Sequence, residues 1–155
     1  MLTSLKKITN EMKVLCDAHP QIKSFHYGEF LDIIKSDSIE YTTTMMNCIQ
    51  SNFDPDRNTT TLVLDVMVMD KIYKDRSNNN DVENTTLLIL RDLVGVIWRS
   101  PRWQELGTWS SISIASKFIE KGADVVTGWG CSITIDVVDG YGYCDTPVSG
   151  YNFEV

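Results

Sequence analysis

Residues 59–101 place a strand pattern, a polar segment and a helix pattern in direct succession, and this stretch constrains the fold more than any other. From Thr60 to Asp70, apolar residues occupy every second position, which is typical of a strand with one buried face. The apolar positions are Leu62, Leu64, Val66 and Val68. The other face carries Asp65 and two methionines, so we expect a strand that is buried on one side and partly covered on the other.

A long helix is predicted to follow this strand. Residues 77–81 offer several N-cap side chains, and Asn80 with Glu83 has the spacing of a capping box. Apolar residues then recur every three or four positions until Pro101, which cannot continue a helix and disfavours helical geometry before it. The expected apolar face consists of Val82, Thr86, Leu87, Leu90, Leu93, Val94, Ile97 and Trp98. Neither element can bury its apolar face alone, so we expect the helix to pack across a sheet.

The rest of the chain supplies an N-terminal helix and further strands. Residues 3–18 form an amphipathic pattern that stops before Pro20. Strand patterns cover residues 22–27, 30–34, 41–49, 109–119 and 125–138. The polar segment 51–58 predicts an exposed hairpin loop, and residues 102–107 predict a connector. The order is helix, strands, helix, two strands, which predicts an α+β fold: a mainly antiparallel sheet with two helices packed on it.

Composition limits the function classes. A chain of 155 residues that is 43% hydrophobic predicts one domain, residues 1–148, with a C-terminal tail at 149–155. The formal net charge of -7 argues against a surface that grips a phosphate backbone. The first residues lack the pattern of a signal peptide, and no apolar run reaches the roughly 20 residues that cross a bilayer. We therefore expect reduced thiols and no membrane contact.

The sequence contains no pattern that carries catalytic chemistry. Gly-rich phosphate loops, nucleophile elbows and HExxH are absent, and the four cysteines are spaced too widely to predict a zinc site. No local pattern supports a thiolate pair of Cys144 with His26. The acidic residues of 136–145 miss the spacing of a calcium loop, and Asp54 and Asp56 flank a proline as turn residues do. We expect no enzyme activity, no cofactor and no metal.

Aromatic residues mark the first candidate contacts. Trp98 and Trp129 lie on expected core faces, whereas Trp103 and Trp109 are expected to be exposed. Exposed indoles serve as anchors between subunits, which is our preferred interpretation, or as platforms for sugar rings. The tail from residue 139 adds further aromatic residues, and such a terminus is either loose or docked on a neighbouring subunit. These are Tyr141, Tyr143, Tyr151 and Phe153.

Charged residues mark the remaining candidates. Lys71, Lys74 and Arg76 form a basic group after the long strand. They are either a solvated hairpin end or a group that pairs with acidic residues of another subunit. Asp54 and Asp56 lie in the predicted loop 51–58. We therefore expect contacts at four places: residues 51–58, 71–80, 102–109 and 139–155.

Several stretches together resemble a known family. They are Ala18–Phe25 after the N-terminal helix, Leu64–Asp70 followed by Asp81–Thr85, and Val126–Ile135 closed by Cys144–Pro147. The pattern is similar to that of small virion proteins of crAss-like phages and related phages of Bacteroidetes, which are similar in fold to tail-terminator and tail-completion proteins. The resemblance covers roughly residues 1 to 148 and contains no catalytic group. Residues 102–108 and the extension after Val148 do not match it.

The resemblance implies a structural virion protein without enzymatic activity, assembled in the host bacterial cytoplasm. It would form a ring at the head-to-tail neck or tail end, as a tail-terminator, tail-completion or neck ring protein. Its expected partners are copies of itself in a closed ring and the portal, other neck ring or tail-tube proteins. Genome DNA would pass through the lumen without sequence-specific binding. The alternative is a receptor- or carbohydrate-binding virion module, which requires Trp103 and Trp109 to be exposed together in one groove.

Overall fold

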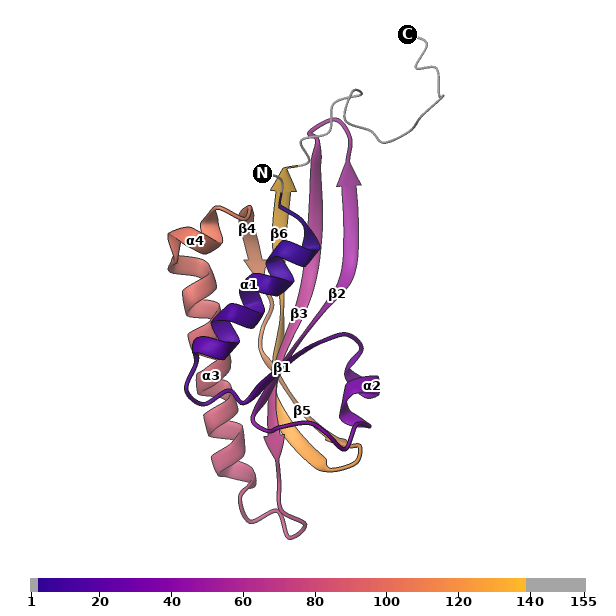
Figure 1. Cartoon of the computed structure of the whole chain (residues 1–155), viewed down its shortest axis with the longest axis vertical. Coiled ribbons are helices and arrows are strands. Elements are labelled where there is room, and N and C mark those ends of the chain that lie inside the picture. The colour runs from indigo at the N-terminus through magenta and orange to yellow at the C-terminus, as the bar shows by residue number, and fades with distance from the viewer. Residues whose placement is uncertain (1–2, 139–155) are drawn as a thin grey trace.

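The computed structural model describes residues 3–138, in which helices lie on both faces of one six-stranded sheet (Figure 1). In chain order the elements are α1 (Leu5–Ala18), β1 (Ser24–Tyr27), α2 (Phe30–Ile34), β2 (Thr43–Asp54), β3 (Thr59–Lys71), α3 (Asn79–Arg99), α4 (Pro101–Gln104), β4 (Thr108–Ile112), β5 (Ser116–Lys121) and β6 (Val125–Val138). The predicted α+β class is confirmed. None of these helices combines the length and apolar character that crossing a membrane requires.

The sheet has the strand order β1-β2-β3-β6-β4, and β5 also pairs with β6. Only the pairing of β1 with β2 is parallel, so the predicted antiparallel character is confirmed. The single strand expected at 109–119 is two strands, because β4 and β5 follow one another along the same edge of β6. Between them the Ser132 N–H donates to Ser113 Oγ at 2.8 Å, a side-chain contact at the place where residues 113–115 leave the ladder.

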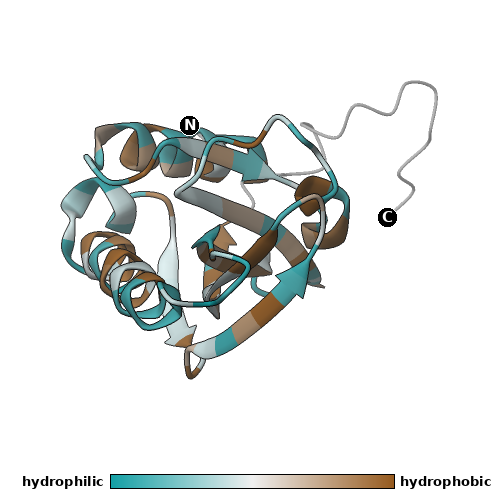
Figure 2. Cartoon of the chain, turned by 90° about the horizontal axis from the view of Figure 1, so that it is seen from below, coloured by the Kyte–Doolittle hydropathy of each residue, from teal (hydrophilic) through white to brown (hydrophobic). Residues whose placement is uncertain are grey.

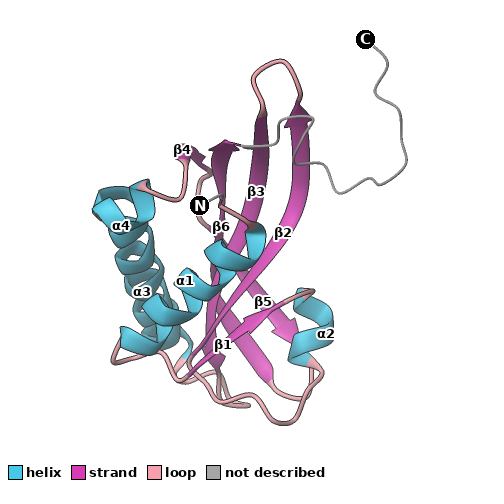
Figure 3. Cartoon of the chain, turned by 45° about the horizontal axis from the view of Figure 1, so that its top comes forward, coloured by secondary structure: helices cyan, strands magenta, loops and turns pink. Residues whose placement is uncertain are grey.

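The main core lies on the face of the sheet that carries α1 and α3, which we call the helical face (Figure 3). The predicted apolar face of β3 is confirmed, since Leu62, Leu64, Val66 and Val68 are all buried. In β6 the alternate residues Cys131, Ile133, Ile135 and Val137 are buried in the same cluster. Figure 2 shows α3 nearly end-on, with hydrophobic and hydrophilic residues around it, as an amphipathic helix requires.

The long helix begins two residues earlier than the predicted capping box implies. Its N-cap is Asn78, whose Oδ1 accepts from the Tyr73 N–H at 2.8 Å and holds the preceding loop. The helix ends at Arg99, before the proline, as predicted. The core position expected for Trp98 is wrong, because its side chain is 37% exposed. Ile97 takes the fully buried position, and one further residue rotates the side chain about 100° away from the sheet.

The strand expected at residues 30–34 is the short helix α2. Gly28, with φ of +142°, ends the preceding strand in a conformation that favours glycine. Phe30, Ile33 and Ile34 have the i, i+3, i+4 spacing of one helical face, and they pack in a second cluster with Met45, Met69 and Val126. We call the sheet face that lies opposite α1 and α3 the opposite face. This cluster covers its lower part, where upper and lower refer to the view in Figure 1. A five-residue apolar run fits either element, and here the contacts favour the helix.

The hairpin loop predicted at 51–58 is shorter than expected. β2 continues to Asp54 and β3 starts at Thr59, which leaves a turn of residues 55–58. Asp54 Oδ1 accepts from the backbone N–H groups of Asp56 at 3.1 Å and of Arg57 at 3.2 Å. This geometry is the Asx turn that Asp adopts before a proline, so the turn interpretation of the two carboxylates is confirmed.

Two buried thiols should make the fold sensitive to alkaline pH. Burial raises the pKa of Cys16 from 9.0 to about 12, and burial together with nearby Asp65 raises the pKa of Cys131 to about 11. Both thiols ionise at lower pH in the unfolded chain. Their contribution to stability is therefore complete below pH 9 and is lost as the pH rises through 11 and 12.

We expect the free energy of unfolding to fall above pH 9 by up to about 1.4 kcal/mol per pH unit for each thiol. Urea unfolding at a series of alkaline pH values measures this slope. The variants Cys16→Ala and Cys131→Val remove the two thiols and should flatten it, whereas Lys and Tyr titration is common to all three proteins. Equal slopes in the wild-type chain and both variants contradict the expectation.

Candidate subunit interface

The two tryptophans expected to be exposed are buried, so this prediction is wrong. Trp103 is 3% and Trp109 is 8% exposed, and their ring centroids are 5.7 Å apart at an interplanar angle of 60°. The Trp109 Nε1–H donates to the Trp103 carbonyl oxygen at 2.9 Å. Pro101 starts the short helix α4, which turns the expected connector back into the core. Neither indole is available as a sugar platform or as an anchor on another subunit.

The charged candidates do not gather at one place. Lys71 already has partners within the chain, because its Nζ lies 3.0 Å from Asp124 Oδ2 and 5.2 Å from the centre of the Tyr41 ring. Lys74 and Arg76 lie in the exposed loop between β3 and α3, at the opposite end of β3 from the Asp54 turn (Figure 1). The predicted tail contacts Tyr141, Tyr143, Tyr151 and Phe153 lie outside the described residues, as does Cys144.

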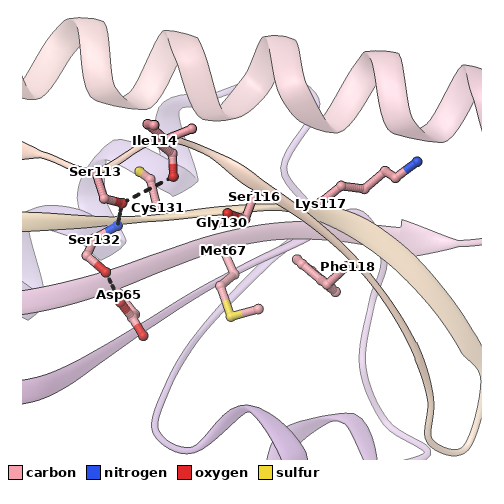
Figure 4. Close-up of a pocket in the computed structure, with 10 residues that line it drawn as sticks. All are labelled: Asp65, Met67, Ser113, Ile114, Ser116, Lys117, Phe118, Gly130, Cys131 and Ser132. Atoms are coloured by element: carbon pink, nitrogen blue, oxygen red, sulfur yellow. Dashed lines mark hydrogen bonds between the residues drawn. The ribbon is translucent and has the colours of Figure 1, made fainter.

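One pocket lies beside the break between β4 and β5 and has a volume of about 260 Å³ (Figure 4). Its polar groups bond mainly to one another: Ser132 Oγ donates to Asp65, and the Ser132 N–H donates to Ser113. The Lys117 side chain extends away from these groups, and its Nζ lies 3.2 Å from Glu83 Oε1 of α3. Burial keeps the Cys131 thiol protonated by raising its pKa to about 11. This geometry contains no activated nucleophile.

Metal chemistry finds no support in the part of the chain that the structure describes. There, no three His, Cys, Asp or Glu side chains lie close enough together to hold an ion. The remaining candidate contact surfaces are the parts of the sheet edges that have no neighbouring strand and carry no charge.

The upper part of β2 forms an open edge that carries no charge, although its pairing with β3 shifts register between Cys48 and Gln50. β1 pairs only with Thr43–Met46, so within residues 3–138 the stretch 47–54 has a strand, β3, on one side only. From Tyr41 to Phe53 the sequence has thirteen consecutive residues without a charge. Exposed edges normally carry Lys, Pro or inward-pointing charges that prevent pairing with another chain. This edge carries none of them before Asp54.

A second uncharged edge lies at the other side of the sheet, on β4, whose pairing with β6 shifts register between Trp109 and Ser111. In the described region β4 pairs with β6 alone, and residues 106–116 are eleven consecutive positions without a charge. The strand below it on the same edge differs, because β5 carries Lys117, Glu120 and Lys121. This edge is therefore charged in its lower part and uncharged in its upper part.

The two open edges lie at the same level of the sheet. One row of paired residues crosses it through Cys48, Leu64, Ile133 and Ile112. A second row crosses it through Ser51, Leu62, Ile135 and Trp109. Since each successive pair is antiparallel, β2 and β4 run in opposite directions. The two open edges therefore have opposite strand directions, and the edge positions below them are occupied by β1 on one side and by β5 on the other.

Exposed apolar side chains flank both open edges. Beside β4, an open groove of about 350 Å³ lies between α3 and residues 112–115, and we call it the α3 groove. Its lining residues are Leu87, Leu88, Leu90, Arg91, Val94, Ile112, Ser113, Ala115 and Cys131. On the β2 side, Tyr27 is 42%, Ile49 is 52% and Phe53 is 59% exposed. Sequence reasoning did not identify either edge as a candidate contact, although the two uncharged runs contain Ile49, Phe53 and Ile112 and could have pointed to them.

The opposite face of the sheet is polar above α2. Its carboxylates are Asp54, Asp65 and Asp136, and Asp136 accepts from Thr61 Oγ1 at 2.5 Å. The strand pairing places the following residues on this upper area: Asn47, Gln50, Asn52, Asp54, Thr59, Thr61, Val63, Asp65, Thr108, Ser111, Ser132, Thr134, Asp136 and Val138. None of these is Lys or Arg, so this part of the face is acidic.

Comparison of the sequence with known protein families finds no match, and comparison with curated proteins finds none either.

Proposed function

We propose that the protein is a structural virion subunit of a tailed bacteriophage that assembles head to tail into a closed ring at the head-to-tail neck or tail end. The observation that carries the ring is the pair of uncharged open edges at one level of a single sheet. They give each copy two different patches, and such contacts close into a ring when the rotation between neighbours permits. The phage setting is proposed from the resemblance in sequence.

The polar opposite face supports the same proposal. In a ring joined through its sheets, every copy turns the same face inward, and the bulk of α1 and α3 favours placing the helical face outside. The lumen would then be lined by Asp54, Asp65, Asp136 and uncharged polar side chains. Such a surface repels phosphates, so DNA would pass without being held. Portal, other neck ring or tail-tube proteins would dock above and below.

The receptor- or carbohydrate-binding alternative receives no support from the geometry. It needed Trp103 and Trp109 to be exposed together in one groove, and both are buried against each other. We therefore propose the ring subunit alone.

The mass of the protein in solution tests the proposal. Light scattering over a concentration series, alone and with the portal or tail-tube protein of the same phage, should detect a closed oligomer of fixed mass. Chains that stay monomeric under all these conditions contradict the proposed function. Electron microscopy of the oligomer separates a closed ring from an open filament.

Two variants test which further regions contribute to the ring or its docking. The double change Lys74→Glu and Arg76→Glu reverses two exposed charges, and deletion of residues 149–155 removes the last aromatic side chains. Lys71 is left intact because it pairs with Asp124. We expect each variant to weaken ring formation or docking several-fold without changing the thermal unfolding of the subunit, since exposed charges contribute only about 0.2–1 kcal/mol per pair. Normal assembly by both variants removes these regions from the interface.

A further inference from the structure

We infer that residues 151–155 of one copy add as an antiparallel strand to the open edge of β2 in the next copy, an inference that rests on the proposed ring. The receiving stretch is 50–54, which pairs regularly with β3 after the register shift at Cys48. Within residues 3–138 this stretch has no strand on its other side. The added strand would join two copies through an edge that the fold leaves unpaired.

The outline of the sheet favours a strand between neighbouring copies. In the lower part of the sheet β1 extends one strand beyond β2, whereas β4 and β5 both lie directly beside β6. If β4 of one copy touched β2 of another at their common level, β1 would occupy the place of β5. A strand inserted above β1 moves the second copy outward by one strand spacing, about 4.8 Å. β1 then lies beside β5 instead of in its place.

The C-terminal segment has the sequence of an edge strand. Residues 151–155 read Tyr-Asn-Phe-Glu-Val, so apolar and polar side chains alternate as in a strand with one covered face. Tyrosine, phenylalanine and valine are also enriched in strands. Pro147 and Gly150, which are typical of turns, precede this pattern. No Lys or Arg occurs in residues 139–155, so the segment lacks the side chain that most often prevents pairing at an edge.

The place where β6 ends gives the segment its direction and reach. Asp54 and Val138 both pair with Thr59, so β6 ends at the level of the receiving stretch. β2 and β6 are both antiparallel to β3, so a segment that folds back after β6 runs antiparallel to β2.

The distances favour the next copy as the receiver. The position beyond β4 is two strand spacings from β6, about 10 Å, and residues 139–150 span up to about 40 Å when extended. The route to the β2 edge of the same copy is longer, because it passes β3 and the turn at 55–58.

The side chains of the two strands are complementary when Tyr151 lies opposite Phe53. Phe53 is 59% exposed and shares the helical face with Ser51, whose partner Leu62 belongs to the main core. An aromatic pair directly across an antiparallel ladder is a favourable contact. The same register places Asn152 opposite Asn52, Phe153 opposite Ser51, and Glu154 opposite Gln50. The polar pairs then lie on the opposite face, where amide groups can bond to one another and to the carboxylate.

A mixing experiment tests this contact. The acceptor variant carries Ser51→Lys and Phe53→Lys at two exposed positions, and the donor variant carries Tyr151→Lys and Phe153→Lys. Lysines at an edge block strand pairing, and losing an aromatic anchor typically weakens an interface by roughly 30-fold or more. We expect each variant alone to be monomeric under the conditions in which the wild-type chain assembles. A 1:1 mixture should give a complex of two copies and nothing larger, because one intact junction remains.

Matched controls separate this contact from general effects of charge. The double variant Val14→Lys and Tyr73→Lys adds the same two charges at side chains that are 48% and 63% exposed, away from both open edges. It should assemble as the wild-type chain does. The double variant Ser51→Thr and Phe53→Tyr should also assemble, because it keeps side chains that favour strands. All these variants should keep the wild-type melting temperature within a few degrees.

Cross-linking identifies which chain supplies the strand. In the variant with Asn52→Cys and Asn152→Cys, a short bis-maleimide should join separate copies into a ladder of covalent oligomers on a denaturing gel. The two single variants measure the background from the native cysteines. Links within one chain assign the segment to its own β2 edge and overturn the inference, as does an assembled ring without links above background.

The remaining outcomes separate this inference from the proposed function. Normal assembly of the acceptor or the donor variant overturns the inference, and so does a 1:1 mixture that stays monomeric. If the wild-type ring forms and both variants form it too, only this inference fails. If no wild-type ring forms, the proposed function fails and the inference fails with it.

Discussion

Replacing Trp103 by Ala is expected to lower the free energy of unfolding by about 3–5 kcal/mol. The side chain is 3% exposed and belongs to the main core, where its ring packs edge-on against Trp109. Removing it leaves a cavity beside Trp109, whose indole N–H is fixed by the Trp103 carbonyl and cannot easily move to fill the space. A domain of this size has a total stability of roughly 5–15 kcal/mol, so the variant would be close to unfolding.

The comparison variant is Trp98→Ala. Trp98 is 37% exposed on the outer side of α3, so its loss should cost less than about 1 kcal/mol. Urea unfolding followed by far-ultraviolet circular dichroism suits both variants, because removing a tryptophan changes the fluorescence signal itself. Equal losses at the two positions contradict the packing described here. A loss of ligand binding in the Trp103→Ala protein would therefore reflect its lower stability and would not show that Trp103 contacts the ligand.

Long periodic segments of the sequence predicted the fold well. The alternation in residues 60–70 and 125–138 identified the two central strands, and the buried face of the first is the one expected. The period of residues 82–97 and the proline at 101 identified α3 and its end. In these segments one face is buried along the whole length, so local pattern and tertiary contact agree.

The structure of short segments could not be predicted from the sequence. Phe30–Ile34 fits a strand or a helical turn, and contacts with Met45 and Met69 decide the outcome. Trp103 and Trp109 lie in a segment without a long period, and α4 brings them into the core through contacts with residues distant in sequence. Local sequence contains no information about such contacts, because they depend on where the chain returns.

The interface proposed from the structure differs from the one predicted from the sequence for a related reason. An uncharged run such as residues 41–53 suits a buried central strand as well as an open edge. Only the order of strands in the sheet separates the two, and that order depends on pairings between distant segments. The charged residues chosen from the sequence lie in turns, where charge is ordinary. The absence of charge at β2 and β4 is the more specific signal once the sheet order is known.

Replacing Gly128 by Ala is expected to cost about 4 kcal/mol or more, enough to prevent stable folding. Gly128 lies in β6, between Met69 of β3 and Phe118 of β5. A Cβ atom added there would lie 1.9 Å from the Val68 carbonyl oxygen and 2.8 Å from the Met69 Cα. Both neighbours are backbone atoms in the centre of the sheet, so relief requires separating β3 from β6 where they form the core.

Gly130→Ala provides a control two residues away, on the same strand and the same face. Its added Cβ would meet the Met67 Cγ at 3.0 Å and the Val66 carbonyl oxygen at 3.4 Å. The Met67 side chain is flexible and can move by the few tenths of an ångström needed, so the cost should stay below about 1.5 kcal/mol. Thermal unfolding of both variants measures the difference. A Gly128→Ala chain as stable as Gly130→Ala would show that β3 and β6 do not approach as closely as the register requires. The common level of the two open edges, which depends on that register, would then lose its basis.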